Sequence, residues 1–432
     1  MSDELNRLVE KAKNVYLYAF SLIATEATHY GSDDVKGLDH FREFPDNTEK
    51  RVVRLNMDTL YSLGFTQLAN TPYEVHVPKI EDRYYLFPIM DAYTNVVESI
   101  GTRTPDKAEG DYVLLYRDTP VPAGYENHRV IRLENSLNSI LLRIETRGKK
   151  DYEYVNKYQD QFVFKPIFPE KLESVPPMEV APAELLRTIS TKDYFELFAK
   201  LSKFNKIKDA KVLSNFKDLG YEEVEANFDY DKTSEKARKA LEIAHKECLE
   251  AIVNGEYVDK SDFVIYANWT QKFKDIGNYG TNYVARAVTA YQGWGANIPQ
   301  DSSYASSFTG PDGKELSAKK TYKLTFEKDG FPHASYFWSL TLYGTPSQYP
   351  ADNKINRYAI NTYDVLDNIV ELNEDGSLDI YISREEPKDE KAAKNWLPAP
   401  AVEDTFSLAI RIYYPDEFTL EGKWVPPVIT EV

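Results

Sequence analysis

The stretch FSLAIRIYYP, residues 406–415, alternates between apolar and polar side chains with the period of two that is typical of a β-strand. Apolar residues form one face and polar residues the other, in the two sets Phe406, Leu408, Ile410, Ile412 and Ser407, Arg411, Tyr413. Such a strand belongs to a sandwich, with a hydrophobic core on one side and a groove or interface on the other. The stretch therefore predicts a β-sandwich at the C-terminal end of the chain.

Similar short segments, rich in Tyr, Val, Ile and Leu and separated by turn residues, occur in two regions of the chain. The C-terminal region contains TYKLTFEK (321–328), SYFWSLTLYG (335–344) and LDIYISRE (378–385). The N-terminal region contains YEVHVP (73–78), RYYLFPIMD (83–91), YVLLYR (112–117), HRVIRLE (128–134) and SILLRIET (139–146). Both regions are predicted to be jelly-roll-like β-sandwiches or barrels.

Apolar residues at spacings of three and four predict a helix over residues 3–29 and a helical segment in the middle of the chain. The predicted fold is thus mainly β with helical segments. Its predicted parts are an N-terminal helix and connector (1–49), a first β domain (50–150), a helical linking segment (151–255) and a second β domain (256–432).

Composition restricts the possible partners. With 69 acidic and 52 basic residues the net charge is −17, which disfavours nucleic acids and anionic membrane surfaces. The start of the chain has no signal peptide of the Sec type, and no apolar run is long enough to span a bilayer. We therefore expect a soluble, cytoplasmic protein.

The usual cofactor and metal motifs are absent from the sequence. The single cysteine, Cys248, excludes a thiolate cluster, and the six histidines never fall in a metal-binding spacing. There is no GxSxG elbow, no phosphate-binding loop and no GxGxxG fingerprint. We therefore predict no metal and no cofactor. The 32 tyrosines supply ring surfaces that can serve sugars and polyols.

Several motifs carry a family resemblance. NMDTLYS (56–62) and RYYLFPIMDAYTNVVESIGTRT (83–104) resemble the family called domain of unknown function 1254. YGTNYVARAVTAYQGWGAN (279–297), SYFWSLTLYG, NKINRYAI (353–360) and GKWVPPV (422–428) resemble its usual C-terminal partner, domain of unknown function 1214. The resemblance implies two tandem jelly-roll-like domains, often compared in layout with double jelly-roll capsid subunits. It implies no established reaction.

The N-terminal motifs contain the first set of candidate ligand-binding residues, Asn56, Asp58, Tyr61, Asp91, Tyr93 and Arg103. Asp58 could bind a polyol or act as a general base, although an Asx-turn made by Asn56 and Asp58 is the preferred interpretation. Asp91 is a second catalytic candidate, because two facing carboxylates would form a glycosidase pair. Arg103 could pair with Asp58 or Asp91, or bind an anionic substrate.

The second set of candidates, Asn356, Arg357 and Tyr358, follows a turn-rich loop of the C-terminal region. Arg357 could instead form an ion pair with Asp352. Three hypotheses follow for the whole chain. It binds a small neutral, polyol-like or sugar-like ligand near the domain junction; it is a hydrolytic enzyme that uses Asp58 or Asp91 as acid or base; or it is an assembly protein that forms a homo-oligomer.

Overall fold

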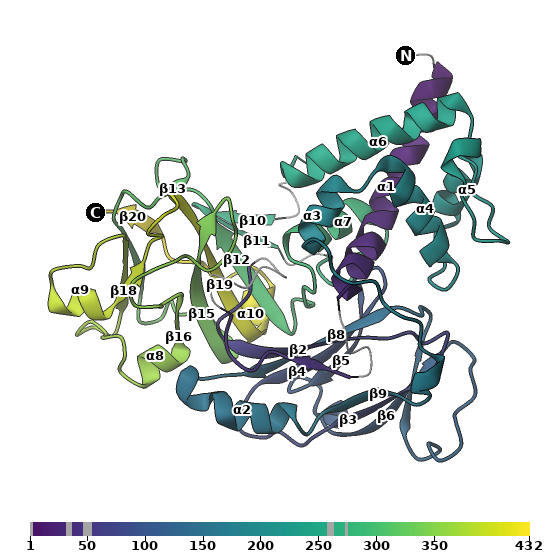
Figure 1. Ribbon diagram of the computed structural model, residues 1–432. Coiled ribbons are helices and arrows are strands. Elements are labelled where there is room, and N and C mark those ends of the chain that lie inside the picture. Colours follow the sequence, from purple (N-terminus) through teal and green to yellow (C-terminus); the bar gives the residue numbers. More distant parts are fainter. Residues whose placement is uncertain (1–2, 32–36, 46–53, 257–262, 273–274) are drawn as a thin grey trace.

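The structure is a computed structural model that describes residues 3–31, 37–45, 54–256, 263–272 and 275–432. The chain forms an N-terminal β unit, a helical layer and a C-terminal β unit, with the C-terminal unit at the left of Figure 1. The predicted boundary between residues 49 and 50 lies outside the described residues. Among the residues that are described, no helix is both long and apolar enough to cross a lipid bilayer.

The N-terminal β unit consists of two sheets that pack face to face. One sheet has the order β1 (Asp39–His40), β2 (Thr59–Phe65), β8 (Asn138–Glu145), β4 (Tyr85–Asp91), β5 (Val96–Gly101). The other has the order β7 (Arg129–Leu133), β6 (Gly110–Tyr116), β3 (Tyr73–Val77), β9 (Val163–Pro166). Alternate residues of both sheets, such as Val75, Leu114 and Leu142, form a core between them. Helix α2 (Tyr152–Gln159) precedes β9, so this unit continues past residue 150.

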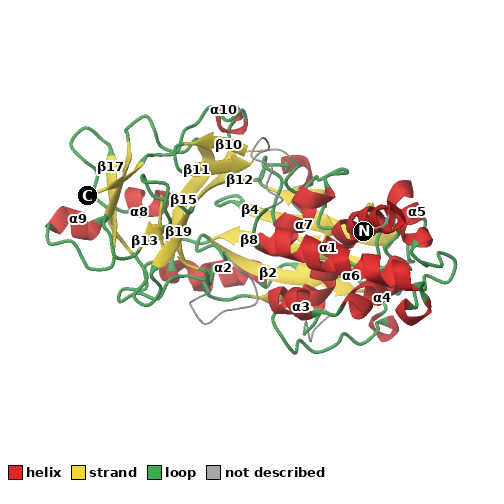
Figure 2. Cartoon of the chain, turned by 90° about the horizontal axis from the view of Figure 1, so that it is seen from above, coloured by secondary structure: helices red, strands yellow, loops and turns green. Residues whose placement is uncertain are grey.

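The helical layer surrounds the long helix α1 (Asp3–His29), which the sequence predicts. Its other members are α3 (Pro182–Thr188), α4 (Thr191–Ser202), α5 (Ala210–Asp218), α6 (Glu235–Val253) and α7 (Tyr283–Gln292). The core of this layer includes Phe65, Met90 and Leu141, which lie on the outer face of the five-stranded sheet. Figure 2 shows the helices over the strands of the N-terminal unit and the C-terminal sheets at the other end of the molecule.

The C-terminal β unit repeats the two-sheet arrangement. Its larger sheet has the order β10 (Phe263–Tyr266), β11 (Trp269–Lys272), β12 (Ser302–Ser307), β19 (Thr405–Pro415), β15 (Ala334–Thr345), β16 (Ala359–Asn361), and β13 (Leu316–Ser317) also pairs with β19. Its smaller sheet has the order β18 (Trp396–Pro398), β17 (Leu378–Ser383), β14 (Tyr322–Phe326), β20 (Ile429–Glu431). Short helices α8 (Thr362–Leu366), α9 (Glu390–Lys394) and α10 (Glu417–Leu420) lie in the connections.

The strand predicted over residues 406–415 is confirmed, because it corresponds to β19. Its four apolar residues are buried with Leu324, Leu340 and Ile380 in the core between the two C-terminal sheets. The fold is mainly β with helices, as the sequence predicts. None of the sheets formed by the described residues closes into a barrel.

Replacing Leu340 by alanine tests the C-terminal core. Leu340 is fully buried in β15 beside Ile410 of β19. We expect Leu340→Ala to lower the free energy of unfolding by about 2–5 kcal/mol, because it leaves a cavity between the sheets. Chemical denaturation measures the change. The control Ile355→Ala, at a residue that is 50% exposed, should change stability by less than about 0.5 kcal/mol; equal losses for both variants would contradict the assigned core.

Candidate functional site

The two β units meet through the outer face of the five-stranded sheet and the polar face of the seven-stranded sheet. On the first face, Tyr61 of β2 lies opposite Arg143 of β8. On the second face, Arg411 of β19 lies between Tyr304 of β12 and Ser339 of β15. A small apolar contact of Tyr84, Leu86, Phe337 and Tyr413 joins the two faces. The groove or interface predicted for the polar side of residues 406–415 is therefore the junction between the units.

Asn56 makes the turn that leads into β2. Its Oδ1 accepts hydrogen bonds from the backbone N–H groups of Asp58 (3.0 Å) and Thr59 (2.9 Å). Its Nδ2 donates to the hydroxyl of Tyr61 (2.7 Å). This is the Asx-turn that the sequence predicts, but Asn56 alone forms it. The side chain of Asp58 is therefore available for another contact.

Asp58 reaches across the junction to the C-terminal unit. Its Oδ2 accepts hydrogen bonds from Ser339 Oγ (2.6 Å) and from the hydroxyl of Tyr413 (3.0 Å). The residue is 1% exposed, and its Oδ1 has no hydrogen-bond partner among the described residues. Burial raises the pKa of Asp58, while Arg411 and the two hydroxyl donors oppose that rise. A buried carboxylate oxygen without a donor is costly unless something else binds it.

Arg411 provides positive charge next to Asp58, and Arg54 lies near Arg411. Arg411 donates to the carbonyl oxygen of Arg54 (2.8 Å) and to Thr341 Oγ1 (3.1 Å). Both guanidinium groups lie over the ring of Tyr343, at 5.6 Å for Arg411 and 4.9 Å for Arg54. Burial lowers the pKa of Arg54 to about 10, so this side chain still carries its charge at neutral pH.

Arg143 brings a third positive charge from the N-terminal unit. It is 4% exposed, and its guanidinium lies 5.2 Å from the ring centre of Tyr61. It donates to Asn297 Oδ1 (2.7 Å) and to the carbonyl oxygen of Gly295 (2.6 Å). Gly295 has a φ of 81°, and a Cβ atom there would lie 2.8 Å from Leu141 Cδ2, so glycine is required for this close approach.

Further unpaired polar atoms lie around these charges. Asn297 Nδ2 and Ser302 Oγ are buried without a hydrogen-bond partner among the described residues. Ser302 lies opposite Tyr413, which binds Asp58. The hydroxyl of Tyr304 makes no hydrogen bond within the part of the chain that is described, and its ring lies under Arg411 at 5.9 Å. Burial raises the pKa of Tyr61, and the charges of Arg143 and Arg411 oppose that rise, so both arginines act on the same ring.

Asp91 and Tyr93 lie elsewhere in the N-terminal unit. Asp91 Oδ1 accepts hydrogen bonds from the backbone N–H groups of Tyr93 and Asn95, both at 2.9 Å, and so closes the turn between β4 and β5. Asp91 is paired with Asn138, whereas the strand that follows Asp58 begins opposite Glu145, seven residues further along β8. This register separates the two positions by about 23 Å along the direction of β8. Glycosidase carboxylates are at most about 10 Å apart, so Asp58 and Asp91 do not form such a pair.

The remaining candidates have structural contacts of their own. Arg103 pairs with Asp301 across the junction, with 2.5 Å between Nε and Oδ1, and not with Asp58 or Asp91. Arg357 donates to the carbonyl oxygens of Lys394 (2.7 Å) and Trp396 (2.9 Å), and not to Asp352. The hydroxyl of Tyr358 donates to Asn356 Oδ1 (3.2 Å), beside the edge strand β16.

The structure brings Asn56, Asp58 and Tyr61 together, and it adds residues that the sequence did not single out as ligands. These are Arg54, Arg143, Tyr304, Ser339, Arg411 and Tyr413. The polar face of residues 406–415 was the signal for Arg411 and Tyr413. No comparable signal exists for Arg143, which stands in the apolar run SILLRIE.

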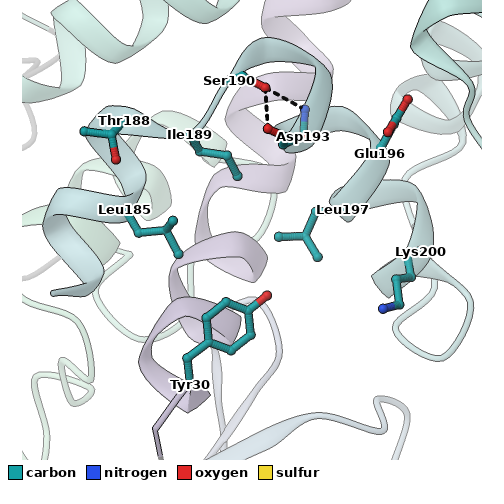
Figure 3. Close-up of a pocket in the computed structure, with 9 residues that line it drawn as sticks. All are labelled: Tyr30, Leu185, Thr188, Ile189, Ser190, Asp193, Glu196, Leu197 and Lys200. Atoms are coloured by element: carbon teal, nitrogen blue, oxygen red, sulfur yellow. Dashed lines mark hydrogen bonds between the residues drawn. The ribbon is translucent and has the colours of Figure 1, made fainter. Parts of the chain in front are cut away.

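Two hollows differ greatly in size and chemistry. One, of about 10 Å³, lies next to the junction between the connector residues Phe41–Pro45 and the segment Leu55–Tyr61. The other is an open groove of about 560 Å³ between α1, α3 and α4. Figure 3 shows Ser190 and Asp193 of this groove bonded to each other, and Glu196 accepts the backbone N–H of Tyr230. The junction contains the unpaired buried atoms Asp58 Oδ1, Asn297 Nδ2 and Ser302 Oγ, so we take the junction as the candidate site.

Metal ligands do not gather at the junction. Within the described ranges, no group of three His, Cys, Asp or Glu side chains is placed to hold a metal ion. The acids next to Asp58 are already engaged. Asp301 pairs with Arg103, and Glu145 pairs with Arg147 at 2.8 Å. The chemistry of the site is therefore that of one carboxylate, several tyrosines and an excess of guanidinium groups.

Comparison with family models assigns both ends of the chain. Residues 35–166 match the family described as "Protein of unknown function (DUF1254)". Residues 301–417 match the family described as "Protein of unknown function (DUF1214)". The predicted resemblance and its order along the chain are confirmed. A search of curated proteins finds no match.

Two solved structures resemble the chain over nearly its whole length. The VPA0106 protein from Vibrio parahaemolyticus is 21% identical, with a TM-score of 0.70 and coverage of 98% of this chain and 100% of that one. A putative uncharacterized protein from Burkholderia cenocepacia is 14% identical, with a TM-score of 0.46 and coverage of 100% and 94%. The first likeness shows a shared fold, and the second carries no argument.

The raised pKa of Asp58 makes a prediction about stability. The pKa of Asp58 is higher in the folded state than in the unfolded chain, where it is about 4. The group therefore contributes its full stabilisation below about pH 4, and this stabilisation is lost as the pH rises through the folded-state pKa. Asp58→Asn removes this titration. We therefore expect the unfolding free energy of the variant, minus that of the native protein, to increase between about pH 4 and pH 8. Urea denaturation over this range measures it, and a decrease would contradict the assigned burial.

Proposed function

The chain joins a DUF1254 domain to a DUF1214 domain, and we propose that it binds a small polyhydroxylated molecule where these two domains meet. The binding residues would be Asn56, Asp58 and Tyr61 from the first domain, and Tyr304, Ser339, Arg411 and Tyr413 from the second. Sites between domains are common for small ligands, because both sides supply groups that converge on one space.

The unpaired Oδ1 of Asp58 is the observation that carries this proposal. It is buried and lacks a donor among the described residues, while Oδ2 of the same carboxylate has two. Most buried polar atoms in native proteins have a partner, and we propose that a ligand supplies the one for Asp58 Oδ1. A ligand hydroxyl is a donor of suitable size. Asn297 Nδ2 and Ser302 Oγ offer further positions for ligand oxygens.

The small hollow beside Asn56 and Tyr61 sets a condition on binding. Its volume of about 10 Å³ is room for about one water molecule. This hollow has no room for a sugar-sized ligand, so the junction has to open for binding. Binding then selects an opened state, and it is slower than diffusion allows.

Ligand contacts of Asp91, Tyr93, Arg103, Asn356, Arg357 and Tyr358 stay predictions, as do a hydrolytic role for Asp58 or Asp91 and a homo-oligomer. The jelly-roll connectivity of the two β units also stays a prediction.

Asp58→Asn tests the proposed site. In the variant, the amide oxygen still accepts from Ser339 and Tyr413, but the amide NH₂ replaces the unpaired acceptor with a donor. A ligand hydroxyl that donates to Oδ1 would then face another donor. We expect a panel of sugars, polyols and hydroxy acids to contain a binder whose affinity falls at least about tenfold in the variant. Isothermal titration calorimetry and thermal shift measure this loss.

The matched control is Asp118→Asn, which makes the same replacement at an exposed loop position. It should bind as the native protein does. If no compound of the panel binds the native protein, or if Asp58→Asn binds as tightly as the native protein, the proposed function is wrong.

A further inference from the structure

Positive charge exceeds negative charge at the junction. Arg54, Arg143 and Arg411 lie there, together with Asp58. Two further acids, Asp301 and Glu145, are neutralised by ion pairs with Arg103 and Arg147. Asp364, whose pKa Asp58 helps to raise, interacts with Arg357 and closes the cap of α8. The local excess is therefore two positive charges.

The three guanidinium groups bind neutral oxygens within the part of the chain that is described. Arg143 donates to Asn297 and to the carbonyl oxygens of Leu141 and Gly295. Arg411 donates to Thr341 and to the carbonyl oxygen of Arg54. Arg54 donates to Gln348, Ser306 and Ser407.

Burial makes this charge excess significant. Arg143 and Arg411 are 4% and 5% exposed, so water screens them little. A buried charge without an opposite charge nearby is strongly unfavourable compared with the same charge in water. Protein carbonyls, hydroxyls and tyrosine rings reduce this cost without neutralising the charge. An anion between the two domains would neutralise it.

The two innermost arginines, Arg143 and Arg411, both act on Tyr61. Arg143 lies over the ring of Tyr61 at 5.2 Å, and Arg411 lies over the ring of Tyr304 at 5.9 Å. The charges of both arginines act on Tyr61, and Tyr304 acts on Tyr61 and Arg143. We therefore place the ligand beside these two rings, near both guanidinium groups and near Asp58, which interacts with Arg411 and accepts a hydrogen bond from Tyr413.

We infer that the ligand of the junction is a hydroxy acid, a small molecule with one carboxylate and neighbouring hydroxyl groups. This inference rests on the proposed function. The carboxylate is placed against Arg143 and Arg411, whose planar groups match its two oxygens. A hydroxyl group of the same molecule donates to Asp58 Oδ1. The sequence predicts a neutral ligand. Because positive charge is in excess at the junction, we infer an acidic ligand in its place.

A carboxylate fits this site better than a phosphate. A carboxylate carries one negative charge, whereas a phosphate monoester carries about two at neutral pH and is larger. The carboxylate of Asp58 lies in the same space and repels a dianion more strongly than a monoanion.

Matched pairs of compounds separate this inference from the proposed function. Glucuronate and glucose differ in one carboxylate, as do gluconate and glucitol, and glucose 6-phosphate is the phosphate probe. Calorimetry on the full chain should show that at least one acid binds at least about tenfold more tightly than its neutral counterpart and more tightly than the phosphate. Raising the salt concentration should lower the affinity for the acid more than the affinity for the neutral compound.

Tyr304→Phe is the variant that should keep the fold. It removes a hydroxyl that makes no hydrogen bond with the described residues, and it leaves the ring in place. We expect it to weaken binding of the acid about tenfold without changing the melting temperature of the free protein. The control is Tyr381→Phe, at a partly buried tyrosine of β17 in the smaller C-terminal sheet. This control should bind as the native protein does.

The outcomes distinguish the two claims. If the neutral sugar or polyol binds as tightly as its acid, and Asp58→Asn abolishes that binding, the proposed function stands and the hydroxy acid is wrong. If the phosphate binds most tightly, the inference that the acidic group of the ligand is a carboxylate is wrong. If no compound binds, or if acid binding is unaffected by Tyr304→Phe and Asp58→Asn, both claims fail.

Discussion

The carboxylate of Asp58 makes the buried contact around which the proposed site between the two domains is built. Through Oδ2 it holds Ser339 and Tyr413 of the C-terminal unit, while Asn56 fixes the turn from which it projects. The contact brings Asp58 next to Arg411 in a place from which water is largely excluded. The same burial that makes the contact strong raises the pKa of the carboxyl group and leaves Oδ1 unpaired. Structure and proposed function thus use the two oxygens of one side chain.

Much of the fold follows from local sequence patterns. The alternation in residues 406–415 predicts both the strand and its polar face, and the helix over residues 3–29 follows from its apolar spacing. The motif NMDTLYS predicts a turn, and it leads to Asn56, Asp58 and Tyr61. These features are predictable because each depends on neighbours a few residues away.

The rest of the site depends on contacts between distant segments. Asp58 lies 281 residues from Ser339 and 355 residues from Tyr413, and no spacing rule connects them. The sequence alone does not decide between Asn56 and Asp58 as the residue of the Asx-turn, because both side chains are able to form it. In the structure the side chain of Asp58 bonds to the C-terminal sheet instead. In the sequence, Arg143 is a single charged residue on an ordinary strand. It is buried only because the two β units meet at this face. The sequence leaves three partners open for Arg103, namely Asp58, Asp91 or an anionic substrate, whereas in the structure Arg103 pairs with Asp301 of the other domain.

A crystal structure of the protein with glucuronate tests the central claim most directly, because it observes the two oxygens of Asp58 separately. The account predicts that Oδ2 keeps Ser339 and Tyr413 and that a ligand hydroxyl lies about 2.5–3.0 Å from Oδ1. It also predicts the ligand carboxylate beside Arg143 and Arg411. A protein group bonded to Oδ1, with no ligand between the sheets at a saturating concentration, would contradict it.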